Sequence, residues 1–522
     1  MARVLVTETI AASGLDLLRD AGHEVDVREG LDPGALLEAV AGAHGLIIRS
    51  ATKVTAEVIE AGSDLVVIGR AGVGLDNVDV DAATAQGVMV VNAPESNILS
   101  AAEQAMALLL AQARNLPQAH AALVEGRWER SKWEGVELHG KTLGIVGLGR
   151  VGTLVAQRAL AFGMRLIAYD PYVSAERARH LGVELRGLDE LVAEADFLTV
   201  HLPKNAETVG LIGADLLAKA KPGIRIVNTA RGGIIDEAAL ADAIASGHVG
   251  GAGLDVFDKE PTTESPLFGL ASVVVTPHLG ASTAEAQDKA GVTIAEQVLL
   301  ALAGDFVPFA VNVAASGVSE PVRPFMGLVE QLGRFFGCLH QRVPDRMEVE
   351  VQGALAAERT DILTLCALKG LFATSTEDPV SFVNVSQMAA RRGLEIRETS
   401  TASSSEYVNL VTLRSGLHSV AGTLTTGSHS EPRVVMVDDH AVEVAPSPHM
   451  LVIRNDDRPG MIGVVGTVLG GAGISIHSMA LEPTSQGNTA LMVLSVDVPI
   501  PDEVVASLVQ STGILGVDRI NL

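Results

Sequence analysis

Three positions in the middle of the chain carry side chains that could bind a carboxylate and take up a hydroxyl proton while a hydride leaves the same carbon for a cofactor. Arg231, Glu260 and His278 each follow a short apolar run of the kind that forms a buried strand. Histidine titrates in the range that a base for a hydroxyl proton needs, and a neighbouring carboxylate orients the ring and stabilises the imidazolium. An arginine offers a forked pair of donors to a substrate carboxylate. Taken singly, the histidine could be structural, and the other two could belong to surface ion pairs.

A glycine-rich segment upstream indicates the hydride acceptor. The apolar run Leu143–Val146 leads into Gly147-x-Gly149-x-x-Gly152, and an amphipathic stretch, Thr153–Ala161, follows. In such a strand–turn–helix the first glycine permits the tight turn, the second lets a pyrophosphate approach the backbone, and the third allows close helix–strand packing. The pattern predicts a dinucleotide site, against the alternative of a glycine-rich turn without a ligand.

An acidic residue then selects between the two nicotinamide cofactors. Asp170 ends the apolar run Leu166–Asp170, about 20 positions beyond the first glycine, where such folds place a ribose-binding carboxylate. A carboxylate there accepts hydrogen bonds from a ribose 2′-hydroxyl and repels a 2′-phosphate. The sequence therefore predicts NAD as the cofactor.

The apolar runs belong to two blocks of alternating strands and helices, which predict an α/β fold with two doubly wound, Rossmann-like parallel sheets. The carboxyl ends of parallel strands form the ligand crevice, so Arg231, Glu260 and His278 are expected to meet at the cofactor. The expected strands are Arg3–Val6, Glu24–Val27, Gly45–Ile48, Leu65–Ile68 and Val88–Val91, then Thr142–Val146, Arg165–Tyr169, Phe197–Val200, Arg225–Val227, Gly253–Val256 and Val273–Thr276, with long helices at about 100–114 and 283–303.

The last part of the chain is organised differently. The alternation stops near residues 311–319, and a mixed pattern runs to about 447, with a serine-rich loop expected at Thr399–Ser405. From His449 the expected order is strand, glycine-rich helix, two strands, helix and strand. This βαββαβ order predicts a ferredoxin-like domain.

Composition excludes several classes of function. The 522 residues, 48% of them hydrophobic, can form several globular cores, and about three or four domains are expected. Lys and Arg number 38 against 63 Asp and Glu, a net charge of −25, which argues against a nucleic-acid partner. Two cysteines and 14 scattered histidines predict neither a disulfide framework nor a metal site. The absence of a signal-like N-terminus or a long apolar span predicts a soluble cytoplasmic protein without membrane contact.

Several motifs together resemble the D-isomer-specific 2-hydroxyacid dehydrogenases, most closely their D-3-phosphoglycerate dehydrogenase branch, over essentially the whole chain. They are Arg70–Asp79, Asn92–Pro94, Ser96-Asn97, the glycine fingerprint and the segments around Arg231, Glu260 and His278. The resemblance implies His278 as acid and base, Glu260 as its partner and Arg231 as the substrate anchor. The cofactor contacts that it implies fall on Arg150, Val151, Asp170, Leu202, Thr229, Ala230, Arg231, Asp255, His278, Gly280 and Ala281, besides Gly147, Gly149 and Gly152.

The cations that would select a phosphorylated substrate are expected in the first block. Arg49 and Arg70 each end a predicted strand and should face the crevice, although strand-end residues can simply be exposed. The backbone after Arg70 is expected to form an anion-binding nest. With Arg231, these arginines would balance about three negative charges on a carboxylate and a phosphate. The predicted substrate-binding residues are Arg49, Ser50, Arg70, Gly72, Val73 and Gly74.

The segment Asn455–Met461 resembles the start of an ACT domain, a small amino-acid-sensing unit that pairs with another copy. In serine-inhibited relatives the ligand contacts correspond to Asn455, Asp457 and Ser475, and this chain has serine at 475 where asparagine is usual. L-serine is therefore an expected effector, with one hydrogen bond either lost or mediated by water, and the alternative is a domain kept only for oligomerisation. The sequence indicates no ligand for the intervening region.

The predicted activity is NAD-dependent oxidation of D-3-phosphoglycerate to 3-phosphohydroxypyruvate, the first committed step of L-serine biosynthesis. Two alternatives stay open: another 2-hydroxyacid dehydrogenase, such as a glyoxylate or hydroxypyruvate reductase, and a non-enzymatic NAD-sensing binding protein. The expected domains are a substrate domain (1–97 with about 284–314), an NAD-binding Rossmann domain (98–283), an α+β intervening regulatory domain (315–447) and an ACT domain (448–522). A homo-oligomer, either a dimer or a tetramer, is expected.

Overall fold

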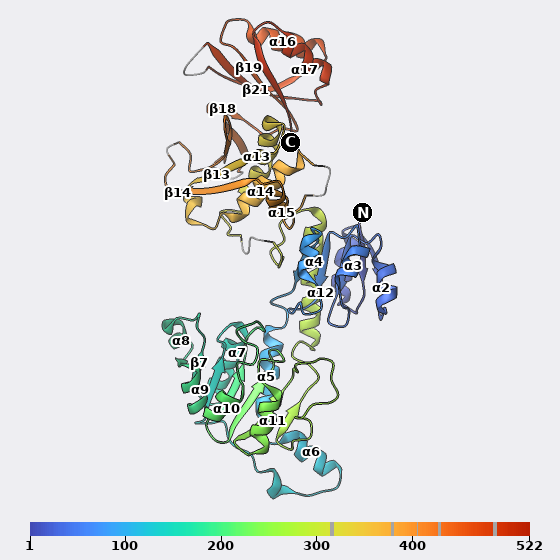
Figure 1. The fold of residues 1–522 in the computed structure, drawn as a ribbon, viewed down its shortest axis with the longest axis vertical. Helices are drawn as coiled ribbons and strands as arrows, with labels where there is room; N and C mark the ends of the chain where they lie inside the picture. The colour runs from blue at the N-terminus through green and yellow to red at the C-terminus, as the bar shows by residue number, and fades with distance from the viewer. Residues whose placement is uncertain (314–317, 377–379, 405, 426–429, 484–487) are drawn as a thin grey trace.

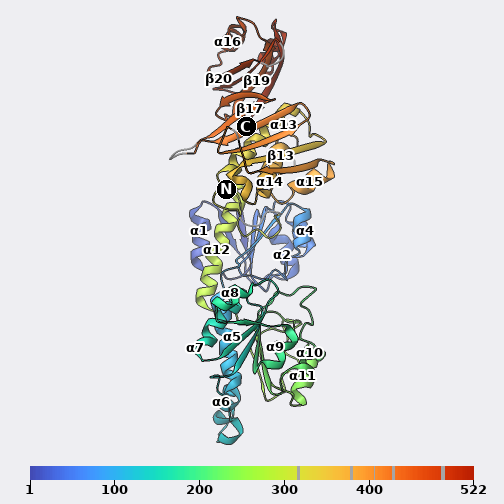
Figure 2. The same cartoon turned by 90° about the vertical axis from the view of Figure 1, so that its left-hand side faces the viewer.

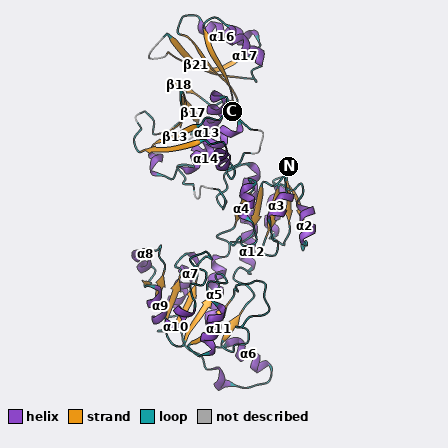
Figure 3. Cartoon of the chain, viewed as in Figure 1, coloured by secondary structure: helices purple, strands orange, loops and turns teal. Residues whose placement is uncertain are grey.

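The computed structural model describes residues 1–313, 318–376, 380–404, 406–425, 430–483 and 488–522. Four sheets form along the chain, and the units that contain them are stacked along the long axis of the molecule (Figures 1 and 2). The second sheet lies at one end, the first sheet lies next to it, and the third and fourth follow. Helices flank both parallel sheets (Figure 3), so the predicted α/β fold class is confirmed.

The first sheet has five parallel strands in the order β2-β1-β3-β4-β5. All four residues of β3 and of β5 are buried, as expected for parallel strands covered on both faces. The strands are β1 (Arg3–Val6), β2 (Glu24–Val27), β3 (Gly45–Ile48), β4 (Val67–Arg70) and β5 (Met89–Asn92), and the helices are α1 (Ala12–Asp20), α2 (Pro33–Val40), α3 (Ala56–Ala61) and α4 (Val80–Ala85).

A long helix, α12 (Ala284–Ala303), returns from the second unit and packs on α1 and β4 of the first. Its closest approach to α1 requires glycine, because a Cβ at Gly14 would lie 2.5 Å from the carbonyl oxygen of Gly291. Thr283 caps the helix N-terminus, and its hydroxyl accepts the N–H of Ala286 at 3.2 Å. After its last turn, the carbonyl of Gly304 accepts a hydrogen bond from the Lys369 ammonium of the third unit at 3.2 Å.

The second sheet has seven parallel strands in the order β12-β11-β10-β9-β6-β7-β8. The order reverses between β6 and β9, which is where open α/β sheets bind ligands at the carboxyl ends of the strands. The strands are β6 (Thr142–Val146), β7 (Arg165–Tyr169), β8 (Glu184–Leu185), β9 (Phe197–Val200), β10 (Ile224–Asn228), β11 (Val249–Leu254) and β12 (Val273–Val275), and the helices are α5 (Ile98–Ala113), α6 (Leu116–Val124), α7 (Arg150–Ala161), α8 (Ala175–His180), α9 (Leu188–Glu194), α10 (Ala214–Lys219) and α11 (Glu237–Ala245).

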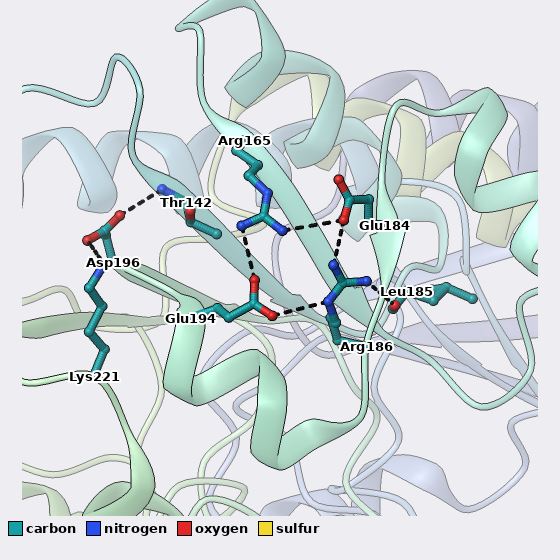
Figure 4. A network of polar contacts seen from close by, with 8 residues as sticks. All are labelled: Thr142, Arg165, Glu184, Leu185, Arg186, Glu194, Asp196 and Lys221. Carbon is teal, nitrogen blue, oxygen red and sulfur yellow. Dashed lines mark hydrogen bonds and ion pairs between the residues drawn. The ribbon is translucent and has the colours of Figure 1, made fainter.

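An ionic network joins β7, β8 and α9 at the opposite, amino-terminal side of this sheet (Figure 4). Arg165 contacts Glu184 at 3.3 Å and Glu194 at 3.0 Å, and Arg186 contacts the same two carboxylates at 2.6 and 3.2 Å. Hydrogen bonds from Arg186 and Arg165 lower the pKa of Glu194. These side chains are largely solvent-exposed and lie away from the carboxyl ends of the strands, so their role is structural.

The third sheet is mixed, in the order β14-β13-β15-β16-β17-β18, and packs on two closely apposed helices, α13 (Phe325–His340) and α14 (Asp361–Ala373). A Cβ at Gly333 would lie 2.2 Å from the carbonyl oxygen of Ala367. The remaining elements are α15 (Val385–Arg391), β13 (Arg346–Gly353), β14 (Glu395–Thr401), β15 (Asn409–Ser415), β16 (His418–Leu424), β17 (Pro432–Val437) and β18 (His440–Val444).

The prediction of a serine-rich loop at Thr399–Ser405 is wrong for its first three residues. Residues 399–401 end the edge strand β14, where Thr399 pairs with Glu350 of β13, and Ser405 lies outside the described residues. The strand is largely exposed and has one neighbour, so it needs no apolar face, and its polar composition imitates a loop.

The fourth sheet follows the predicted βαββαβ order, with the strands arranged β20-β21-β19-β22. Met450 and Leu491 of this sheet share one hydrophobic core with α13. The Arg454 guanidinium contacts Asp438 of the third unit and Asp518 of its own. The elements are β19 (His449–Asp456), α16 (Met461–Gly471), β20 (Ile476–Pro483), β21 (Thr489–Val496), α17 (Asp502–Gln510) and β22 (Ile514–Asn521). None of the described helices is long and apolar enough to cross a membrane.

Candidate active site

A cleft of about 1090 Å³ lies where the first and second units meet. Its walls come from the loops after β3 and β4 of the first sheet, from the loops after β11 and β12 of the second, and from the start of α12. Four of the predicted site residues with ionisable side chains line it: Arg49, Arg70, Glu260 and His278. The topology thus brings together residues that are more than 200 positions apart in the sequence.

His278 and Glu260 form a close pair on the second-unit side of the cleft. The imidazole Nδ1 lies 2.6 Å from Oε2 of Glu260, and the other oxygen of Glu260 accepts the N–H of Phe257 at 2.8 Å. Burial raises the pKa of Glu260, but the hydrogen bonds from His278 and from the Phe257 N–H outweigh it, so this pKa lies below its ordinary value. The carboxylate is therefore ionised over the whole pH range in which an imidazole titrates. Because Glu260 contacts Nδ1, the other ring nitrogen, Nε2, is left for a substrate.

A fully buried carboxylate, Asp255, supports the loop that carries His278. Its oxygens accept the N–H groups of Leu279 and Gly280, both at 2.7 Å, and the hydroxyl of Thr276 at 2.6 Å. His278 itself has a φ of 54°, a left-handed conformation that few non-glycine residues adopt. The hydrogen bonds to Asp255 compensate the cost of that conformation and fix the direction of the ring.

Arg231 lies beside the same cleft, after β10. Its guanidinium packs over Gly74, where a Cβ would lie 2.5 Å from Nη2, and it contacts the carboxylate of Asp76 at 3.6 Å. The charge of Arg231 helps to lower the pKa of both Arg70 and Glu260, so it is close enough to act on both. His278 and Glu260 are therefore in direct contact, and Arg231 lies close to them at the edge of the cleft.

Arg70 is a largely buried cation that faces other cations. Burial lowers its pKa, and the charges of Arg231 and Arg49 act in the same direction, while the carboxylates of Asp76 and Glu8 oppose them. Its Nε is buried without a hydrogen-bond partner among the described atoms. A Cβ at Gly72 would lie 1.8 Å from Nη1 of Arg70, so only glycine leaves room for this guanidinium. Buried, converging positive charge of this kind is suited to an anion.

The anion-binding nest expected after Arg70 does not form at its first two positions. The N–H of Ala71 donates to the carbonyl of Ile48, and the N–H of Gly72 donates to that of Arg70, both at 2.8 Å. The carbonyl of Val73 accepts a hydrogen bond from the Asn92 side chain at 2.7 Å. Strand pairing and turn formation therefore occupy the N–H groups of Ala71 and Gly72, whereas the side chains of Arg49 and Arg70 line the cleft.

The glycine-rich loop between β6 and α7 has the shape that a dinucleotide requires. Gly147 has a φ of 96°, a Cβ at Gly152 would lie 2.1 Å from the carbonyl oxygen of Gly147, and the space above Gly149 is open. The N–H groups at the start of α7 face this space. The hydroxyl of Thr229, after β10, is buried without a partner in the described part of the chain. The open cradle at Gly149 and this unsatisfied polar atom both fit NAD.

Asp170 holds this loop in shape. Its oxygens accept the N–H groups of Leu148 at 2.8 Å and Tyr172 at 2.9 Å, immediately after β7. Arg150 contacts Glu95 at 2.8 Å across the two units, and Leu202 packs against Gly147. The other predicted cofactor positions lie in the loops around the cleft, or at the start of α7, and are Val151, Ala230, Gly280 and Ala281.

A second histidine on the cofactor side, His201, has different properties. Burial lowers its pKa to about 4, and its Nε2 lies 2.9 Å from the hydroxyl of Thr199. His201 is half-buried, and with this pKa its imidazole is neutral near pH 7 and hydrogen-bonded to Thr199. The described residues contain no group of three or more His, Cys, Asp or Glu side chains arranged to hold a metal ion.

The predicted regulatory residues lie in the fourth unit. Asn455 is buried near the end of β19, and its amide donates to the carbonyl of Asp456 at 2.7 Å, while its Oδ1 has no partner among the described atoms. Asp457 is exposed two residues later. The N–H of Ser475 donates to the carboxylate of Asp497 at 2.9 Å. Asn455 thus offers an unsatisfied polar atom in the segment where an effector is expected.

Three family models match consecutive parts of the chain. They are the NAD-binding domain of D-isomer-specific 2-hydroxyacid dehydrogenases at residues 106–280, the D-3-phosphoglycerate dehydrogenase intervening domain at 321–438 and the ACT domain at 449–511. The chain is 51% identical over 508 residues to D-3-phosphoglycerate dehydrogenase of Mycobacterium tuberculosis, covering 96% of both chains. The chain belongs to the D-3-phosphoglycerate dehydrogenase family. The Bacillus subtilis enzyme of that name is 38% identical over the full length of both chains.

A solved structure is similar to more than half of the chain. A crystal structure of a Thermus thermophilus protein covers 59% of this chain and 99% of its own, with 39% identity and a TM-score of 0.55. NAD as the cofactor of the D-3-phosphoglycerate dehydrogenase family agrees with the open cradle at Gly149.

Sequence reasoning missed several residues that shape the site. Asp76 contacts Arg231, and Phe268 packs edge-on against Phe257 at the cleft, with ring centroids 5.2 Å apart. Asp76 stands inside the motif Arg70–Asp79, but its partner is 155 positions away, and nothing local indicates the contact. Phe268 lies in a loop without periodicity, so the sequence carries no signal for it.

Proposed function

We propose that this chain oxidises D-3-phosphoglycerate to 3-phosphohydroxypyruvate with NAD, the step that commits carbon to L-serine. The observation that carries the proposal is the arrangement of the cleft. A histidine–carboxylate pair stands on the second-unit side of it, and Arg49 and Arg70 line the first-unit side. Arg231 lies beside the cleft, close enough for its charge to act on Arg70 and Glu260. A substrate with a carboxylate, a hydroxyl and a phosphate matches this distribution of charge.

In the proposed mechanism Arg231 binds the substrate carboxylate and orients C2. Arg49, Ser50 and Arg70 hold the phosphate at the first-unit side of the cleft. His278, with Nδ1 donating to Glu260, accepts the C2 hydroxyl proton at Nε2, and the ionised Glu260 stabilises the imidazolium that forms. NAD, when bound at the glycine-rich loop, supplies the hydride acceptor for C2. In the reverse direction His278 returns the proton to the carbonyl oxygen.

Replacement of Glu260 by glutamine tests the histidine–carboxylate pair. The pKa of Glu260 lies below its ordinary value, so its carboxylate stays charged near neutral pH. That charge stabilises a protonated imidazole at His278. With glutamine that stabilisation is lost, and we expect the acidic limb of the kcat/KM profile to move to lower pH by about one unit or more. The measurement is kcat/KM for phosphoglycerate from about pH 5 to 9. An unchanged limb would contradict the role given to Glu260.

The proposed activity is tested by NADH oxidation with purified enzyme and three ketoacids: 3-phosphohydroxypyruvate, hydroxypyruvate and glyoxylate. Because several arginines contact the phosphate, we expect kcat/KM to favour the phosphorylated ketoacid by at least about 100-fold. Similar values for all three would favour a general 2-hydroxyacid dehydrogenase. No oxidation of NADH with any of them would favour an NAD-sensing binding protein.

We also propose feedback inhibition by L-serine through the ACT domain, at Asn455, Asp457 and Ser475. The unsatisfied Oδ1 of buried Asn455 supports this proposal. The same ketoacid assay, repeated with millimolar L-serine, gives reduced activity if the site is functional and unchanged activity if the domain serves only in assembly.

The proposed domains are 1–97 with 284–314, 98–283, 315–447 and 448–522, and the proposed assembly is a dimer or tetramer of a cytoplasmic enzyme. The packing of α12 on β4 supports its place in the first domain. Large apolar side chains exposed on α6 and the loop after it support an oligomer: Leu116, Leu123, Val124 and Trp128. The two free cysteines agree with a reducing compartment.

A further inference from the structure

The loop that carries Arg49 and Ser50 is held by a carboxylate from a neighbouring strand end. Glu8 follows β1, which pairs with β3 in a register that places Val6 beside Ile47. The Glu8 side chain accepts three backbone N–H groups of the loop, from Arg49 at 2.8 Å, Ala51 at 3.1 Å and Thr52 at 2.9 Å. Nearly every amide of a four-residue segment thus converges on one side chain.

A second side chain holds the carbonyl groups of the same loop. The amide nitrogen of Asn77 donates to the carbonyl of Arg49 at 2.8 Å and to that of Thr52 at 2.6 Å. Asn77 is itself anchored, because its own carbonyl accepts the N–H of Val54 at 2.8 Å. The hydroxyl of Thr52 also lies 2.8 Å from that of Thr7. The loop is therefore fixed from both sides by side chains whose backbones lie in other elements.

An acidic side chain in this place needs an explanation, because the substrate of the proposed reaction is an anion. Burial raises the pKa of Glu8, and the hydrogen bonds from the backbone of Thr52, Ala51 and Arg49 lower it by more, so the carboxylate is ionised. Its negative charge also favours the protonated form of Arg70. Arg49, Ser50 and Ala51 line the cleft, and Glu8 contacts this loop through its backbone N–H groups. The carboxylate oxygens of Glu8 accept backbone N–H groups. Glu8 can therefore fix the loop that binds the anion without contacting the anion itself.

We propose that Glu8, together with Asn77, is a positioning residue that sets the substrate-phosphate loop 49–52. This inference rests on the proposed function, since it assumes that Arg49 and Ser50 bind the phosphate. Charge-assisted hydrogen bonds to three amides of one short loop are strong enough to select one loop conformation. Without them the loop can sample others, and the guanidinium of Arg49 no longer points consistently at the phosphate.

The test uses the full-length enzyme with 3-phosphohydroxypyruvate, hydroxypyruvate and NADH. Glu8→Gln keeps the side-chain volume and an oxygen for Arg49 and Thr52, but it presents an amide donor to the N–H of Ala51. We expect the KM for 3-phosphohydroxypyruvate to rise about tenfold, because a charged acceptor is lost. The KM for NADH, the KM for hydroxypyruvate and kcat should stay near wild type. Glu8→Ala should give a larger rise, and Arg49→Ala sets the upper limit.

Glu60→Gln is the matched control, because Glu60 is an exposed glutamate on α3 of the same unit. It should leave all three KM values unchanged. Asn77→Ala provides an independent variant, and a double-mutant cycle with Glu8→Gln separates two explanations. If both residues act through one loop, the double variant should resemble the more severe single variant, whereas separate roles would give multiplied effects.

Three results would overturn the proposal: a wild-type KM for 3-phosphohydroxypyruvate in both Glu8 variants, equal increases in KM for all substrates, or multiplied effects in the cycle. If Glu8→Ala does not fold, Glu8→Gln decides. Failure of the proposed function looks different, since the wild-type enzyme itself would then show no preference for the phosphorylated ketoacid.

Discussion

Replacing His278 by asparagine should lower kcat by a factor of about 100 to 10,000, because a general acid–base is lost. Asparagine suits this position better than alanine. It tolerates the left-handed backbone conformation, with a φ of 54°, that His278 adopts, so the loop over Asp255 should keep its shape. The Kd of NADH should remain close to wild type. Steady-state turnover gives kcat, and a fluorescence titration gives the Kd.

His180→Asn in the same unit is the control, because His180 is exposed on α8. Its kcat should equal that of wild type. If His278→Asn keeps more than about a tenth of the wild-type kcat, the proton acceptor is another group, because a general base contributes more than that. A matching loss of NADH affinity would instead indicate that the loop has collapsed.

Replacing Gly232 by alanine should lower kcat/KM by about 100-fold, the cost of a displacement of about 1 Å at a catalytic group. A Cβ at this position would lie 1.8 Å from the carbonyl oxygen of Phe257, and this contact is with backbone, so a side-chain rotation cannot relieve it. Gly232 adjoins Arg231, and the N–H of Phe257 binds Glu260 at 2.8 Å. One added methyl group therefore displaces the anchor and the carboxylate together.

Gly269→Ala is the matched control, since a Cβ there meets no atom within 4 Å. Thermal unfolding of both variants should accompany the kinetics, because overpacking costs about 1 to 3 kcal/mol of stability. A Gly232→Ala enzyme with wild-type kcat/KM would show that the two loops can separate without consequence. That result would contradict the tight coupling of Arg231 and Glu260.

The parallel sheets and the place of the active site could be predicted because topology forces them. Once the alternation of strands and helices is read, the carboxyl ends of the strands must share an edge, and Arg231, Glu260 and His278 follow three of them. Strand limits were less accurate where glycine interrupts the apolar pattern. The strand expected at Gly253–Val256 is β11, Val249–Leu254, because Gly250 and Gly251 hide its beginning.

The supporting contacts could not be predicted, because they depend on register. Glu8 precedes Arg49 by 41 positions, and the pair meets only because β1 lies beside β3. A polar residue at a strand end has many potential partners until that register is known. Helix α13 beneath the third sheet gave little signal for a different reason, since glycines within it resemble helix breakers. In the structure Gly333 is a contact point where α14 approaches the helix backbone.

Helix α12 sets the distance between the active-site loop and the third unit. Its N-terminal end follows the loop that carries His278, its middle meets α1 at Gly291, and the carbonyl of Gly304 just beyond it binds Lys369. An inserted residue would shift everything beyond it by about 1.5 Å and rotate it by about 100°. The glycine contact and the lysine contact could not both survive that change. The surface of α12 can therefore vary in composition during evolution, but its length cannot.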